Sequence, residues 1–83
     1  MHVVVIHQIS DPEKFWGAAS ESELPEGVTL HSALPNDNGS RAVCLWEADS
    51  LDAVQQLVED TVGDVSKNEF FEVNARNAQG LPS

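Results

Sequence analysis

Basic residues are scarce in this chain. Lysine and arginine together number 4, whereas aspartate and glutamate number 14, and the formal net charge is −10 over 83 residues. A surface of this sign repels nucleic acid and anionic membranes, so neither is expected as a partner. The acid excess fits an ordinary acidic protein, and it equally fits adaptation to high salt, where counterions screen the repulsion. A melting temperature that stays constant between low and molar KCl would count against the salt-adapted interpretation.

Cysteines and long apolar runs are also lacking. Cys44 is the only cysteine, so no disulfide can form within the chain. No apolar run approaches the roughly 18 residues that a membrane-spanning helix needs. The apolar residues 1–9 have no basic leader and no small-residue cleavage site, so a signal peptide is not expected. Together these features predict a cytoplasmic protein.

The length allows one domain, residues 1–83, and the sequence pattern predicts six elements within it. Runs of β-branched and alternating residues indicate strands, and apolar residues at helical spacing indicate helices. Strands are expected at 2–9, 28–34, 41–47 and 69–75, helices at 11–20 and 51–62, a hairpin loop at 35–39, and a C-terminal tail from 75 to 83.

Local signals mark the ends of the two helices. Ser10 and Glu13 have the spacing of a capping box, which predicts the start of the first helix. Asp49 and Ser50 are candidate N-caps for the second helix, and Gly63 is a plausible stop signal.

The order strand, helix, strand, strand, helix, strand predicts an α+β fold of the ferredoxin-like type. In this fold the four strands form one antiparallel sheet in the spatial order fourth, first, third, second. Both helices cover the same face of that sheet.

Alternation along the strands divides the side chains between two faces. One set is almost purely aliphatic and aromatic, and we expect it to contact the helices. It comprises Val4, Ile6, Val28, Leu30, Leu34, Val43, Leu45, Phe71 and Val73. The other set is mixed, and we expect it to form the exposed face. It comprises Val3, Val5, His7, Thr29, His31, Ala33, Ala42, Cys44, Trp46, Phe70, Glu72 and Asn74.

An exposed face with this much apolar surface is typical of an interaction site. We therefore expect two copies of the chain to pack sheet to sheet and to enclose a partly polar cavity. The alternative is that the C-terminal tail covers the face of a single copy.

Several short segments resemble a known group of proteins. They are Gly27-Val28-Thr29 with His31-Ser32, the turn Asp37-Asn38-Gly39, and Val43-Cys44-Leu45-Trp46-Glu47-Ala48. The layout is similar to the dimeric α+β barrel superfamily, and within it to a small-protein family of unknown function that includes a nickel-binding member. The resemblance covers residues 25–58 and implies a homodimer, but no ligand residue carries over from it.

The mixed face also contains the residues that could bind a metal ion. If Leu34 pairs with Arg41 across the hairpin, His31 lies opposite Cys44, and His7 is expected beside Ala42 or Cys44. Imidazole and thiolate suit Ni²⁺, Cu²⁺ or Zn²⁺, and a set of His7, His31 and Cys44 leaves one coordination position open. The alternative to a metal site is that Cys44 is a small buried hydrophobic residue and that both histidines are held by hydrogen bonds.

A ligand pocket on this face would be lined by His7, His31, Cys44, Trp46, Phe70 and Glu72. The leading functional hypothesis is a homodimeric binding protein for a small molecule or a transition metal, nickel or zinc. One alternative is a small enzyme, monooxygenase-like or isomerase-like, that uses His7 or His31 as acid or base. A second alternative is a structural accessory subunit without a site. His2, next to the N-terminal amine, is a further but minor candidate for a metal contact.

Overall fold

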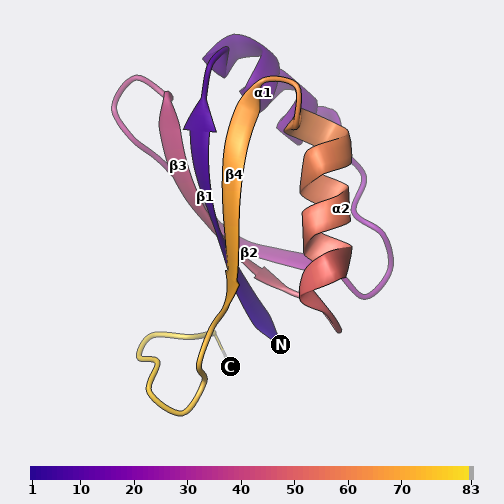
Figure 1. The fold of residues 1–83 in the computed structure, drawn as a ribbon, viewed down its shortest axis with the longest axis vertical. Helices are drawn as coiled ribbons and strands as arrows, with labels where there is room; N and C mark the ends of the chain where they lie inside the picture. The colour runs from indigo at the N-terminus through magenta and orange to yellow at the C-terminus, as the bar shows by residue number, and fades with distance from the viewer. Residues whose placement is uncertain (83) are drawn as a thin grey trace.

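The computed structural model describes residues 1–82 and contains six elements in two layers, a sheet and a pair of helices (Figure 1). The elements are β1 (His2–Ile9), α1 (Pro12–Glu21), β2 (Thr29–Pro35), β3 (Arg41–Glu47), α2 (Leu51–Val62) and β4 (Ser66–Glu72). Neither helix is long and apolar enough to cross a membrane.

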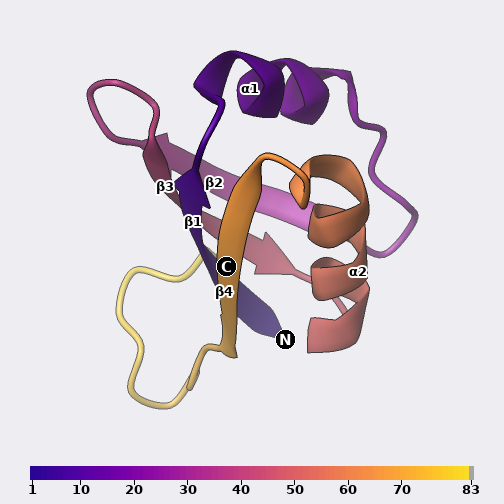
Figure 2. The ribbon, with the colours of Figure 1, turned by 45° about the horizontal axis from the view of Figure 1, so that its top comes forward.

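The four strands form one sheet in the order β2-β3-β1-β4, and all neighbouring strands are antiparallel. Both helices lie on one side of this sheet, and the chain after β4 turns away from them (Figure 2). The predicted ferredoxin-like α+β fold is therefore confirmed, including its strand order.

Local capping explains where the helices begin and end. Ser50 caps α2 by accepting a hydrogen bond from the amide of Ala53, and Gly63 ends the helix, as predicted. The cap of α1 is Asp11, whose side chain accepts from the amide of Lys14. The predicted capping box at Ser10 is wrong, because that hydroxyl donates to the carbonyl of Val65, just before β4, instead.

The assignment of the two sheet faces is inverted relative to the prediction. The face that contacts the helices is the mixed one, with Val3, Val5 and His7 almost fully buried. Cys44 and Trp46 are buried beside them. Side-chain alternation separated most of the two sets correctly, but the more hydrophobic set is not the covered one. The core behind the sheet is completed by Ile9, Phe15, Ala42, Ala48, Val54, Val58, Val62 and Val65.

Small side chains account for this inversion. The side chains of Ala42, Cys44, Val3 and Val5 are small. They leave room for the large side chains of Phe15 and Trp46 between the sheet and the helices. His7, the one buried residue of the polar or charged types in the described core, is tolerated because it is hydrogen-bonded, which offsets most of its cost of burial.

The register of the β2–β3 hairpin differs from the predicted one by two residues, and β2 also contains a β-bulge. Leu34 pairs with Val43 rather than with Arg41, so Ala33 and not His31 lies opposite Cys44. The register then shifts between Leu30 and Ser32. A bulge adds one residue to one strand and therefore reverses the faces of the residues beyond it. Leu30 consequently lies over the core, opposite Trp46.

The other face of the sheet, which we call the open face, is apolar and uncovered. Leu34 is 63% exposed, Val43 42% and Phe71 47%, and Val4 and Ile6 lie between them on β1. The described part of the C-terminal tail does not bury these side chains. The predicted last strand begins three residues early, at Ser66 rather than Glu69, so that more of the chain after Glu72 extends beyond the sheet.

Candidate functional site

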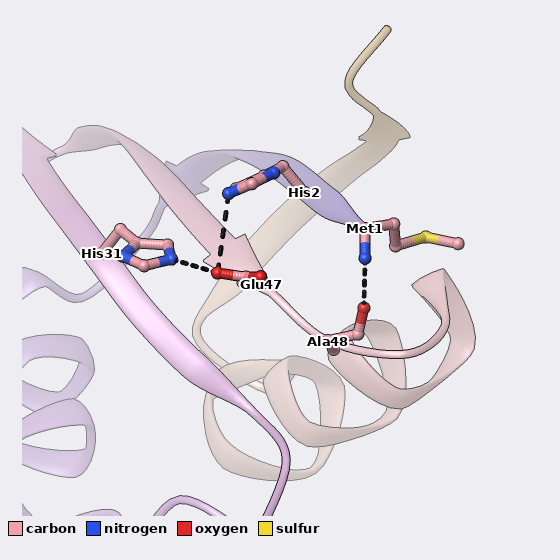
Figure 3. Close-up of polar contacts among 5 residues, drawn as sticks. All are labelled: Met1, His2, His31, Glu47 and Ala48. Carbon is pink, nitrogen blue, oxygen red and sulfur yellow. Dashed lines mark hydrogen bonds and ion pairs between the residues drawn. The ribbon is translucent and has the colours of Figure 1, made fainter. Parts of the chain in front are cut away.

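His2, His31 and Glu47 form a compact cluster at one end of the open face (Figure 3). One ligand atom from each residue lies within 4.8 Å of the others. Within residues 1–82, this is the one group of three or more His, Cys, Asp or Glu side chains whose ligand atoms come so close. The cluster is therefore the strongest candidate for a metal site.

Strand pairing places His2 beside Glu47. The two residues are directly opposite each other in the β1–β3 ladder, where side chains on one face approach closely. Met1 and Ala48 extend this pairing: the N-terminal amine donates to the Ala48 carbonyl at 2.8 Å, and the Ala48 amide donates to the Met1 carbonyl at 3.0 Å. These two bonds hold the start of the chain against the end of β3.

The bulge in β2 brings His31 to the same position. Its Nε2 donates a hydrogen bond of 2.8 Å to Glu47 Oε1, and its ring centroid lies 5.6 Å from that of His2. Without the bulge, alternation would carry His31 to the helix-covered face. The local irregularity of β2 is thus what assembles the cluster.

The electrostatics of the cluster favour an ionised carboxylate and leave one nitrogen unsatisfied. The hydrogen bond from His31 lowers the pKa of Glu47, and the nearby His2 acts in the same direction. His2 Nε2 is buried without a hydrogen-bond partner and lies 3.6 Å from Glu47 Oε1. A buried polar atom without a partner is uncommon and calls for an explanation.

The donor set suits a divalent transition metal. Imidazole nitrogens and a carboxylate oxygen are ligands of zinc and nickel, and metal–ligand bonds of about 2.1 Å place tetrahedral ligand atoms roughly 3.4 Å apart. The Glu47 oxygen lies 2.8 Å and 3.6 Å from the two Nε2 atoms, on either side of that spacing. Small side-chain adjustments would suffice, and the fourth position would stay open.

The predicted site residues do not converge on one place. His7, Cys44, Trp46 and Phe70 lie on the helix-covered side of the sheet, whereas His31 lies on the open face. The side chain of Glu72 is exposed at the end of β4, opposite Val3. The expected neighbourhood of His7 and Ala42 is confirmed, but the sheet separates His7 and Cys44 from His31.

His7 is part of a buried polar network. Its Nδ1 donates to Asn68 Oδ1 at 2.6 Å, and the Asn68 amide donates to Glu59 at 3.2 Å. Burial lowers the pKa of His7, while Asn68 and Glu59 oppose this shift. The adjoining cavity holds about 80 Å³. Pockets for organic molecules usually start at about 300 Å³, so His7 is poorly placed to act on such a substrate.

Cys44 has the properties of a core residue. Its side chain is buried, and burial raises the pKa of the thiol to about 11. A protonated thiol in an apolar layer is a poor metal ligand, because the thiolate is the binding form.

Sequence reasoning missed Glu47 and gave His2 only a minor role. The signal for Glu47 was its position at the end of β3, opposite the first residue of β1, and this pairing could have been inferred from the predicted strand order. The place of His31 could not, because nothing in the sequence TLHSALP marks a bulge.

Comparisons of the chain with protein-family models, with curated proteins and with solved structures give no match. The resemblance of residues 25–58 to a small-protein family therefore stays a prediction, and the fold assignment depends on the topology described above.

Proposed function

We propose that the protein is a homodimeric metal-binding protein in which His2, His31 and Glu47 hold one divalent ion, zinc or nickel. The observation that carries this proposal is the cluster itself: two imidazoles and an ionised carboxylate meet on one side of a sheet. The Nε2 atom of His2 has no hydrogen-bond partner among residues 1–82, so no existing hydrogen bond at that atom would have to break when an ion binds.

The ion would replace a hydrogen bond in this cluster. His31 Nε2–H donates a hydrogen bond to Glu47 in the metal-free state, so Nε2 can bind a metal only when the ring carries its proton on Nδ1 instead. The open fourth position would accept water, a small ligand or a side chain from a second subunit.

The test is elemental analysis of the untagged protein after loading with nickel or zinc and removal of free metal. We expect about one ion per chain in the unmodified protein and in Cys44→Ala, and much less in His31→Ala. The Cys44 variant is the matched control, because it was the predicted ligand that the fold places in the core. Substoichiometric metal in the unmodified protein would contradict the proposal and favour a structural accessory role.

The dimer half of the proposal depends on the open face. Four strands of about seven residues make a face of roughly 23 by 19 Å, so two such faces remove on the order of 1,000 Å² from water. This is the lower limit of a specific interface. A second copy is the natural partner, since a chain of this size buries a modest share of its surface alone and the described tail leaves the face exposed.

Size measurement with variants tests the dimer separately. Val43→Lys places a charge on the central strand β3 of the open face and Phe71→Lys places one on the edge strand β4, at positions that are already about half exposed. We expect a dimer for the unmodified protein and a monomer of normal stability for the variants. A monomer for the unmodified protein at micromolar concentration and high salt would rule out the dimer without affecting the metal test.

A further inference from the structure

Two of the four basic residues in this acidic chain line the same groove, one on each side of Gln8. Arg41 begins β3 and Lys67 lies near the start of β4, and each is paired directly with Gln8 of β1. Directly paired residues project to the same face, so the two cations flank Gln8 in a row across three strands. Their strands are two spacings apart, about 9.5 Å.

The groove around this row lies at one end of the open face, has a volume of about 650 Å³ and is open to solvent in a single copy of the chain. Its lining residues lie at the end of the sheet where β1 leads into α1, and this end of the sheet is uppermost in Figure 1. Its lining also includes the hydroxyl residues Ser10, Ser40 and Ser66. The volume falls in the range of small-molecule sites, roughly 300–1,000 Å³.

The charges of the two cations are not neutralised within the protein. Neither Arg41 nor Lys67 forms an ion pair with any carboxylate in the part of the chain that the structure describes. Asp64 is the one acidic residue in the lining, and Glu69 lies two residues along β4 from Lys67. The lining of the groove therefore carries two cations against one carboxylate, on a molecule whose net charge is −10.

We propose that this groove binds a small dianion that carries phosphate or carboxylate oxygens. Arg41 would offer its planar fork to two oxygens, Lys67 a point charge from the opposite side, and the Gln8 amide a further donor beneath them. The acidic remainder of the surface repels anions, so such binding requires a local site of this kind. The metal cluster lies at the other end of β1, roughly 20 Å away, so the two sites are independent.

The test is an NMR titration of the isotopically labelled full chain with inorganic phosphate and, separately, with succinate, both at constant ionic strength. We expect saturable shifts of the Gln8, Arg41 and Lys67 amides, and the anion that produces them identifies the class. Affinity should fall at least about tenfold in Arg41→Gln and in Lys67→Gln, since each loses a charge-assisted hydrogen bond.

Arg76→Gln is the matched control, because it removes the same charge near the opposite end of β4 and should leave the affinity unchanged. No saturable shift with either anion would overturn the proposal. So would unchanged affinity in both groove variants, or an equal loss of affinity in Arg76→Gln, which would indicate general electrostatic attraction.

Discussion

Replacing His7 with leucine should remove a specific part of the pH dependence of stability. His7 is 2% exposed and hydrogen-bonded to Asn68, and burial lowers its pKa in the folded protein. Below its unfolded pKa of about 6.5, the unfolded chain therefore binds a proton that the native protein does not. The free energy of unfolding should fall as the pH decreases through that window, by at most about 1.4 kcal/mol per pH unit.

The assay is urea unfolding of the unmodified protein and of His7→Leu at several pH values between about 7.5 and 5. The leucine keeps the volume and cannot titrate. In His7→Leu, Asn68 Oδ1 still accepts a hydrogen bond from the Ser66 hydroxyl. The substitution should therefore lower the free energy of unfolding at neutral pH by only about 1–2 kcal/mol. Val54→Ala is the control, because it destabilises the core without removing a titratable group and should keep the slope of the unmodified protein. Equal slopes in the unmodified protein and His7→Leu would refute the reasoning.

Three further predictions concern the core and the hairpin. At pH 8 the native Cys44 thiol, with a pKa of about 11, should react with a disulfide reagent at least about a hundredfold more slowly than in the unfolded chain, and rapid native labelling would contradict its burial. Val54→Ala removes two carbons at a fully buried position and should lower the free energy of unfolding by roughly 2 kcal/mol, measured by urea titration. Gly39→Ala should lower the free energy of unfolding by about 1–2 kcal/mol, because Gly39 has a φ of 75° and an added Cβ would lie 3.1 Å from Trp16 Nε1. A melting temperature equal to that of the unmodified protein would contradict this prediction.

The fold was predictable because several signals agree. The β-branched run of β1 and the apolar spacing of α2, with Ser50 before it and Gly63 after it, depend on neighbours in the sequence. The strand order follows from the element order once a single sheet is assumed. Such local information was sufficient for topology.

The candidate site was less predictable because it depends on which face the helices cover and on one bulge. Val3 and Cys44 were placed on the exposed face, since hydrophobicity alone favoured the aliphatic set for the core. The mixed set is covered instead, because Phe15 and Trp46 pack against its small residues. This packing depends on the shapes of the side chains rather than on their hydrophobicity. The bulge then moved His31 to the open face, beside a carboxylate that the predicted register did not bring near it.

The most direct test of the metal site is anomalous diffraction from crystals of the full chain grown with nickel or zinc. The account predicts one strong anomalous peak per chain, about 2.0–2.2 Å from His2 Nε2, His31 Nε2 and an oxygen of Glu47. A peak next to Cys44 or His7, or no peak at the His2–His31–Glu47 cluster in metal-loaded crystals, would contradict it.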